Sequence, residues 1–117
     1  MTTLLTLLFI KHFIIDFPLQ TKYQWSNKGT YLHMGGVLHS WLHCLGTILC
    51  FVFFTDPFTA IMLGIGDGII HYHIDYAKMR LNAKLGLGPT THEEFWWLLE
   101  FDQLLHSLTY LGLSKFL

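Results

Sequence analysis

The chain has 117 residues, of which 52% are hydrophobic and only 13% are charged, and its formal net charge is −1. A charged fraction of about half the usual value excludes a disordered tail, and the near-neutral balance excludes a basic nucleic-acid binder. The length allows one domain with a modest core. We therefore expect a single apolar domain over residues 1–117 that has no nucleic-acid partner.

The apolar residues fall into four long blocks, each close to the ~20 residues that cross a bilayer as an α-helix. The blocks span about residues 3–20, 31–54, 57–77 and 94–117. Because four spans leave almost no soluble part, the sequence predicts an all-α polytopic membrane protein, a four-helix bundle made of two helical hairpins. The first block lacks the basic start and the cleavage pattern of a signal peptide, so we expect it to be retained as a helix.

The polar connections predict the orientation of the bundle. Segments 21–30 and 78–93 emerge on the same side, and the opposite side carries only Lys115 and the amino terminus. The cations of the first side are Lys22, Lys28, Lys78, Arg80 and Lys84. By the positive-inside rule, the loop between the first and second helices and the loop between the third and fourth helices are cytoplasmic, and both termini are periplasmic. We expect the inner membrane of a bacterium or of a phage-infected host, with the lipid bilayer as the main partner.

Each block carries a pair of metal-competent side chains four residues apart, which places both members on one helix face. The pairs are His12 with Asp16, His39 with His43, His71 with Asp75, and Asp102 with His106. One such pair arises easily by chance, but one pair in every block is a much stronger signal. The predicted topology also places all four pairs at a similar depth, in the cytoplasmic half of the membrane. Because ionisable groups are costly in hydrocarbon, we expect all eight side chains to face the bundle interior.

Five imidazoles and three carboxylates that face one another predict a bound cation. This mixture of nitrogen and oxygen donors suits zinc, with iron or manganese as alternatives, and eight ligands are enough for one or two ions. The arrangement is similar to soluble carboxylate bundles, whose ligands project from facing helices. The alternative is an interior without metal, in which the same side chains hydrogen-bond across the helices.

Other polar residues lie outside the four pairs. We expect His33 near a helix start and His92 in a loop to be structural, and His73 to point about 160° away from the neighbouring pair. Lys11 and Asp67 lie deeper than the pairs and at comparable depth on opposite hairpins. They are therefore expected to form a buried ion pair or a relay toward the far side of the membrane.

Four segments, 12–20, 39–43, 71–78 and 101–106, carry a resemblance to a known family. In chain order they read His-x3-Asp-Phe-x-Leu-Gln, His-x3-His, His-x3-Asp-Tyr-x-Lys and Asp-Gln-x2-His. Over nearly its whole length the chain resembles a family of small inner-membrane proteins from bacteria and phages, which is defined as a domain of unknown function. The resemblance implies a four-helix membrane fold and no particular activity. The accessory residues that it adds to the eight pair members are Gln20, Lys78 and Gln103.

The first functional hypothesis is a membrane-embedded, metal-dependent hydrolase. A bound metal ion lowers the pKa of its water and polarises a phosphoryl or carbonyl group. A site near the cytoplasmic interface would accept a lipid or another anionic, phosphate-containing substrate, which the loop cations are available to attract. The candidate catalytic residues are Asp102, Gln103 and Lys78.

Three alternatives stay open at this stage. Metal-ion or proton translocation is one, because His-x3-Asp pairs resemble the ion sites of zinc-exporting cation diffusion facilitators, although so few helices would need a homo-oligomer for alternating access. A di-iron oxygenase is another, because His39 and His43 resemble one histidine box of the membrane desaturases. The last is a non-catalytic phage or bacterial protein that binds another membrane protein. The sequence does not indicate a particular substrate.

Overall fold

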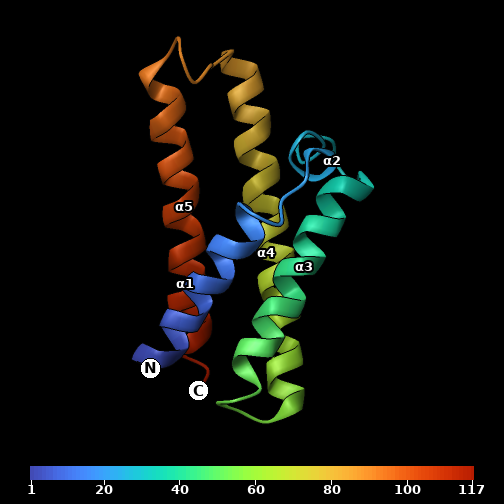
Figure 1. The fold of residues 1–117 in the computed structure, drawn as a ribbon, viewed down its shortest axis with the longest axis vertical. Coiled ribbons are helices and arrows are strands. Elements are labelled where there is room, and N and C mark those ends of the chain that lie inside the picture. Colours follow the sequence, from blue (N-terminus) through green and yellow to red (C-terminus); the bar gives the residue numbers. More distant parts are fainter.

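The computed structural model describes residues 1–117 as five α-helices and no strands, which confirms the predicted all-α class. The helices are α1 (Thr2–Asp16), α2 (Lys22–Trp25), α3 (Met34–Phe51), α4 (Pro57–Leu85) and α5 (Glu93–Ser114). Each of the four long helices contacts two neighbours, so that the order α1, α3, α4, α5 closes on itself around a common interior (Figure 1). The short α2 packs on α3 alone.

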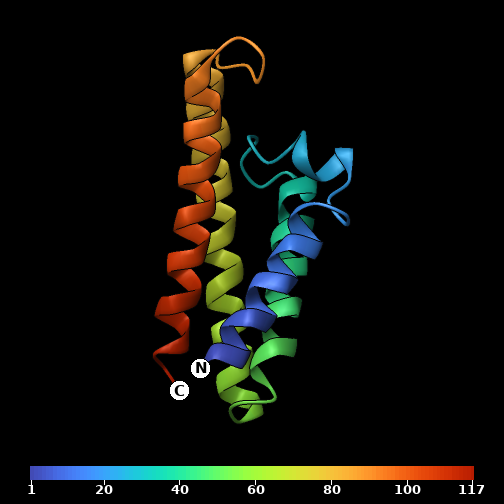
Figure 2. The same ribbon diagram turned by 60° about the vertical axis from the view of Figure 1, so that its left-hand side comes forward.

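The two ends of the bundle differ (Figures 1 and 2). One end carries the α1–α3 connection, which includes α2, and the 86–92 connection between α4 and α5. The other end carries both termini and the 52–56 turn. This arrangement agrees with the prediction that segments 21–30 and 78–93 emerge on the same side.

Two helix ends differ from the predicted ranges. The range 3–20 is too long, because Pro18 lacks an N–H and disfavours a helical conformation of Phe17, so that α1 ends at Asp16. The range 57–77 is too short, because good helix formers continue α4 to Leu85. That helix ends only at Gly86, whose φ of 64° provides a left-handed C-cap. The sequence did not predict α2, and the other two helices match to within three residues at each end.

The start of α4 is defined by its capping residues. Asp56 is the N-cap, where its Oδ1 accepts a hydrogen bond from the backbone N–H of Thr59 at 3.0 Å, and Pro57 occupies the first helical position. Hydrogen bonds with Thr59, through its side chain and then its backbone, hold the pKa of the Asp56 carboxyl below its usual value. The ionised carboxylate therefore stabilises this end of the helix.

Small residues bring α3 and α4 close together. A Cβ atom at Gly64 would overlap Ile48 and lie 2.9 Å from the carbonyl oxygen of Cys44. One at Gly68 would lie 3.0 Å from the Cβ of Cys44 and 3.3 Å from the carbonyl oxygen of Ser40. Larger residues would force the two helices apart. This close approach places the polar pairs of α3 and α4 within reach of each other.

Half of the buried residues are polar, whereas buried positions are usually apolar. Of the 30 buried residues, fifteen are polar or charged, eleven are apolar and four are glycines. An apolar cluster fills only the end that carries the termini; its members are Leu4, Leu8, Cys50, Phe51, Ala60, Leu63, Tyr110 and Leu113. Large apolar side chains instead cover the outward faces of the helices, such as Phe13, Trp41, Ile69 and Phe101, each more than half exposed.

By length and hydropathy, α3 is the one helix that qualifies as a candidate membrane span, and half of it is buried within the bundle. The core helix of a soluble protein has the same properties. Helix α1 has only 15 residues, and α4 and α5 contain several charged side chains. The polytopic membrane arrangement therefore stays a prediction.

Candidate metal centre

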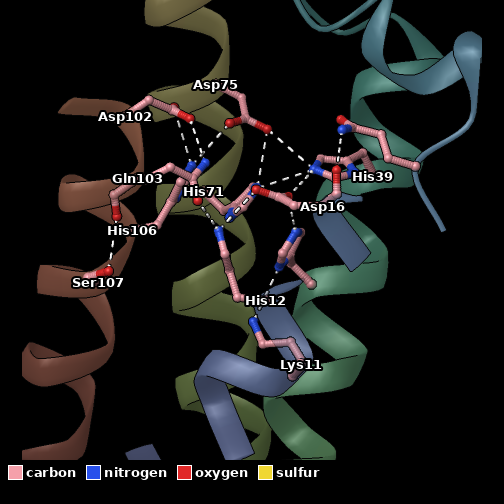
Figure 3. Close-up of polar contacts among 12 residues, drawn as sticks. Lys11, His12, Asp16, His39, His71, Asp75, Asp102, Gln103, His106 and Ser107 are labelled. Atoms are coloured by element: carbon pink, nitrogen blue, oxygen red, sulfur yellow. Dashed lines mark hydrogen bonds and ion pairs between the residues drawn. The ribbon is translucent and has the colours of Figure 1, made fainter. Parts of the chain in front are cut away.

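All eight members of the predicted pairs lie inside the bundle, none more than 8% exposed. They come from all four long helices, and the close-up shows the labelled members converging on one region (Figure 3), where His43 contacts Asp16. The set is His12 and Asp16 from α1, His39 and His43 from α3, His71 and Asp75 from α4, and Asp102 and His106 from α5. The four-residue spacing thus places both members of each pair on the inner face of its helix.

Asp16 is the centre of a first group of donor atoms. Its Oδ1 lies 3.0 Å from Nε2 of His39 and 2.8 Å from Nε2 of His43. Nε2 of His71 lies 3.6 Å from the same oxygen and 3.3 Å from Nε2 of His39. Around a tetrahedral zinc ion with ordinary bond lengths, neighbouring ligand atoms are about 3.3 Å apart. These four residues therefore have the composition and spacing to hold a metal ion.

A second group surrounds Asp75. Its Oδ2 lies 3.2 Å from Nε2 of His71, and its Oδ1 lies 3.1 Å from Nε2 of His106. Nε2 of His106 also lies 3.3 Å from Oδ1 of Asp102. The atoms of His71, Asp75 and His106 are close enough to hold a metal ion as well. Because one imidazole nitrogen binds one ion, His71 serves one of the two groups at a time.

The hydrogen bonds of the cluster leave lone pairs that a cation would satisfy. Nδ1 of His39 lies 3.1 Å from Oε1 of Gln24 and therefore carries the proton of the neutral ring. The unprotonated Nε2 of His39 then faces the Asp16 carboxylate. In addition, Oδ2 of Asp75 and Oδ1 of Asp102 are buried and accept no hydrogen bond, although Lys28 and His106 lie within ion-pair distance of them. Imidazole nitrogens and carboxylate oxygens that keep such free lone pairs fit a divalent cation.

His12 lies beside the first group and is held at both ring nitrogens. Its Nε2 lies 3.0 Å from Oδ2 of Asp16 and 2.8 Å from Oε1 of Gln103. Its Nδ1 lies 2.8 Å from the hydroxyl of Tyr110. When Tyr110 donates to Nδ1, the Nε2–H of His12 donates to Asp16 and orients that carboxylate. Its role as a direct ligand stays a prediction.

Lys11 lies next to the first group (Figure 3) and forms a buried ion pair with Asp67, on the side of the apolar cluster. Nζ of Lys11 lies 3.2 Å from Oδ2 of Asp67, which also accepts a hydrogen bond from the hydroxyl of Thr47. The same ammonium lies 3.2 Å from Nδ1 of His43 and 3.0 Å from the hydroxyl of Tyr110. A metal ion at Nε2 of His43 requires the proton on Nδ1, so Lys11 must release that nitrogen. It can do so because Asp67 and Tyr110 remain as acceptors.

Two further lysines approach the second group from the end that carries the connections. Nζ of Lys28 lies 3.2 Å from Oδ2 of Asp75, and Nζ of Lys78 lies 3.7 Å from Oδ2 of Asp102. Gln103 donates a hydrogen bond of 3.2 Å to the same oxygen of Asp102. The three candidate catalytic residues are thus brought together beside a buried loop lysine.

The remaining histidines lie away from the cluster. Nδ1 of His33 accepts a hydrogen bond of 3.0 Å from the backbone N–H of Gly35 and caps α3. His73 is exposed and lies 3.1 Å from the hydroxyl of Tyr31, and His92 is the N-cap of α5. These positions agree with the structural roles expected for His33 and His92.

Three residues that hydrogen-bond to the cluster or to the Lys11–Asp67 pair were not predicted from the sequence. Thr47 follows His43 by four residues, and Tyr110 follows His106 by four residues. Extending the spacing of the pairs by one helical turn would have found both. Gln24 lies in the unpredicted α2, where no spacing marks it.

The fold and the site together define a closed bundle of four long helices with a buried cluster of histidines and aspartates that can hold a metal ion. The chain belongs to the family described as protein of unknown function DUF3307, whose model matches residues 4–115. Comparisons with curated proteins and with solved structures found no match. The match confirms the resemblance to a domain of unknown function and assigns no activity.

Proposed function

We propose that the protein is an integral membrane metalloprotein of the bacterial inner membrane and a metal-dependent hydrolase. Its interior cluster holds one or two divalent transition-metal ions, with zinc as the first candidate and iron or manganese as alternatives. Its substrate is a lipid or another phosphate-containing anion that enters near the cytoplasmic interface. The oxygenase and the non-catalytic partner are the other outcomes of the experiments below.

The membrane location is supported by the distribution of side chains. Polar groups fill the interior, and large apolar groups such as Phe13, Trp41 and Phe101 face outward. In water this arrangement would expose a large apolar surface, whereas in a bilayer the same surface contacts lipid. The polar pairs also lower the mean hydropathy of their helices, although their polar side chains face inward and not toward the surroundings of the bundle.

The metal centre rests chiefly on the geometry of His39. Gln24 fixes its proton on Nδ1, and its Nε2 lies 3.0 Å from a carboxylate oxygen of Asp16 and 3.3 Å from Nε2 of His71. Without a proton or a metal ion between them, these atoms direct lone pairs at one another. A divalent ion satisfies all three donors at once, as in zinc sites whose histidines are oriented by a neighbouring acceptor.

The second group supports hydrolysis. A divalent ion bound there would supply a water of lowered pKa and polarise the bond to be broken. Oδ1 of Asp102 is a buried acceptor without a hydrogen bond, while Gln103 and Lys78 hold its other oxygen. This free oxygen supports Asp102 as the group that accepts a proton from an attacking water.

Translocation receives less support from the same interior. Lys11 and Asp67 extend the polar network beyond the metal centre, as a relay would require. Beyond them, however, the apolar cluster that includes Leu4, Leu8 and Phe51 fills the end of the bundle. An ion or a proton leaving at that end would have to cross this apolar region.

An activity assay in a reconstituted membrane tests the proposal. The purified protein in phosphatidylcholine nanodiscs is supplied with zinc, manganese or ferrous iron, and the release of phosphate and of fatty acid from added lipids is measured. We expect metal-dependent hydrolysis that falls to background in His39→Ala/His43→Ala. The matched control is His92→Ala, which removes an imidazole outside the cluster and should keep the activity. Equal hydrolysis by both variants would contradict the proposal.

A further inference from the structure

Two hollows meet at Lys78, next to the second group. The first is a cavity of about 270 Å³ between the α1–α3 connection and the extended ends of α4 and α5. Its lining includes Gln20, Lys28 and Lys78, and it has the volume of about nine waters in the liquid. The second is a groove of about 520 Å³ between α4 and α5. Lys78 and Asp102 are its charged lining residues.

The cavity is the one that fits an anion. With neutral imidazoles, the four buried aspartates of the cluster and the three lysines paired with them carry a net charge of −1. One divalent ion changes this charge to +1, and two ions change it to +3. Because buried positive charge is costly without a counter-ion, the metal-loaded site needs an anion. Lys28 and Lys78 face the cavity, and Lys is a common phosphate ligand.

The other cations of this end do not contribute to the cavity. Arg80 and Lys84 line a separate exposed hollow, and Lys22 is exposed at the start of α2. Gln20 in contrast has a buried Oε1 without a hydrogen-bond partner, an acceptor for a water or for a protonated phosphate oxygen. Lys28 and Lys78 therefore line the cavity, whereas Lys22, Arg80 and Lys84 lie elsewhere at this end of the bundle.

Lys78 lines both the cavity and the groove, so the two hollows adjoin the same side chain. The remaining lining of the groove is almost entirely apolar, with Ile74, Ala77 and Leu81 from α4 and Leu98, Phe101 and Leu105 from α5. A molecule with a charged head in the cavity would thus direct an apolar tail along the outer face of the bundle.

We propose that the substrate is a phosphate carried on one long apolar chain. The phosphate lies between Lys28 and Lys78, and the chain lies in the groove between α4 and α5. Hydrolysis breaks the bond between phosphorus and the chain oxygen, water supplies the new oxygen on phosphorus, and the chain leaves as an alcohol that takes one proton of the water. This inference rests on the proposed function, because the bound metal creates the demand for an anion.

Equilibrium binding tests the inference without relying on turnover. Radiolabelled dodecylphosphonate, which has no chain oxygen to be cleaved from phosphorus, is titrated onto the zinc-loaded protein in phosphatidylcholine nanodiscs, with empty nanodiscs as the control for partitioning. We expect Lys28→Gln and Lys78→Gln each to weaken binding at least tenfold. Lys78→Arg should keep most of the affinity, because it keeps the charge, and the matched control Lys84→Gln should bind like the wild type.

A second variant and a second ligand test whether the apolar chain binds in the groove. Ala77→Phe fills the groove without changing any charge, so it should weaken the binding of dodecylphosphonate at least tenfold and leave the binding of inorganic phosphate unchanged. Equal affinity of the wild type for both ligands would overturn the chain site and make free phosphate the ligand.

The metal content of every sample distinguishes a failure of this inference from a failure of the proposed function. A zinc-loaded wild type that binds dodecylphosphonate no better than Lys28→Gln/Lys78→Gln overturns this inference and leaves the proposed function standing. A wild type that holds no metal overturns both. Unchanged helix content and zinc content in the lysine variants show that a loss of binding is not a loss of fold.

Discussion

The buried pair of Lys11 and Asp67 tests the interior arrangement independently of any metal. Their side chains are 7% and 1% exposed, and Nζ lies 3.2 Å from Oδ2. Lys11→Met keeps the length of the side chain but leaves the carboxylate without its cation. Removing one partner of a buried pair costs about 3–5 kcal/mol. Because the hydroxyl of Thr47 still donates to Asp67, we expect a loss near the lower limit, about 3 kcal/mol.

A second substitution shows whether this loss belongs to the pair. In Lys11→Met/Asp67→Leu both charges are gone, so we expect the stability to return to within about 1 kcal/mol of the wild type. The assay is reversible unfolding by sodium dodecyl sulfate in mixed micelles, followed by circular dichroism with a chelator present. Lys84→Met, an exposed lysine of α4, is the control and should change stability by less than about 0.5 kcal/mol.

Two results would refute this reasoning. The first is a loss below about 0.5 kcal/mol in Lys11→Met, which would mean that the ammonium is solvated and not buried beside Asp67. The second is a loss in the double variant that equals the sum of the losses measured for Lys11→Met and for Asp67→Leu alone, which would mean that the charges do not interact.

Three further predictions follow from the site and the fold. His71 is shared by both donor groups, so His71→Ala should lower the metal content more than His106→Ala, which elemental analysis measures; equal losses would contradict the shared role. Acidification below about pH 6 should release the metal, because imidazole must be neutral to bind, and a pH-independent metal content in equilibrium dialysis would oppose this. Asp56 has a lowered pKa in the folded state, so its stabilisation is present above the unfolded pKa and lost as the pH falls through the folded one. Asp56→Asn keeps a capping side chain that does not titrate. The Tm of the wild type relative to that of Asp56→Asn should therefore fall as the pH falls from 5 to 3, and a constant difference would contradict the assignment.

The polar pairs were predictable because a helix repeats nearly every four residues. His39 and His43 share a face whatever the tertiary structure, and the cost of exposing them to lipid or to an apolar core gives that face its direction. The same argument placed Lys11 and Asp67 at one depth, where the structure shows their ion pair.

Other parts of the site depend on contacts that spacing does not encode. Gln24 and Lys28 reach the cluster from the α1–α3 connection, whose path is set by the turn at Pro18 and by the packing of α2 on α3. The length of α4 was underestimated because the predicted span ended with the apolar run, whereas helix propensity carries the helix on to Leu85. For α4, helix propensity and hydropathy thus predict different C-terminal ends.

The metal content of the purified protein tests the central claim most directly. The protein is purified in a nonionic detergent without a metal-binding tag, and the metal per chain is measured by elemental mass spectrometry beside His39→Ala/His43→Ala and His73→Ala/His92→Ala. The account predicts one to two transition-metal ions per chain in the wild type and in the second variant, and their loss in the first. A wild type without transition metal, or one whose metal survives the removal of His39 and His43, would contradict it.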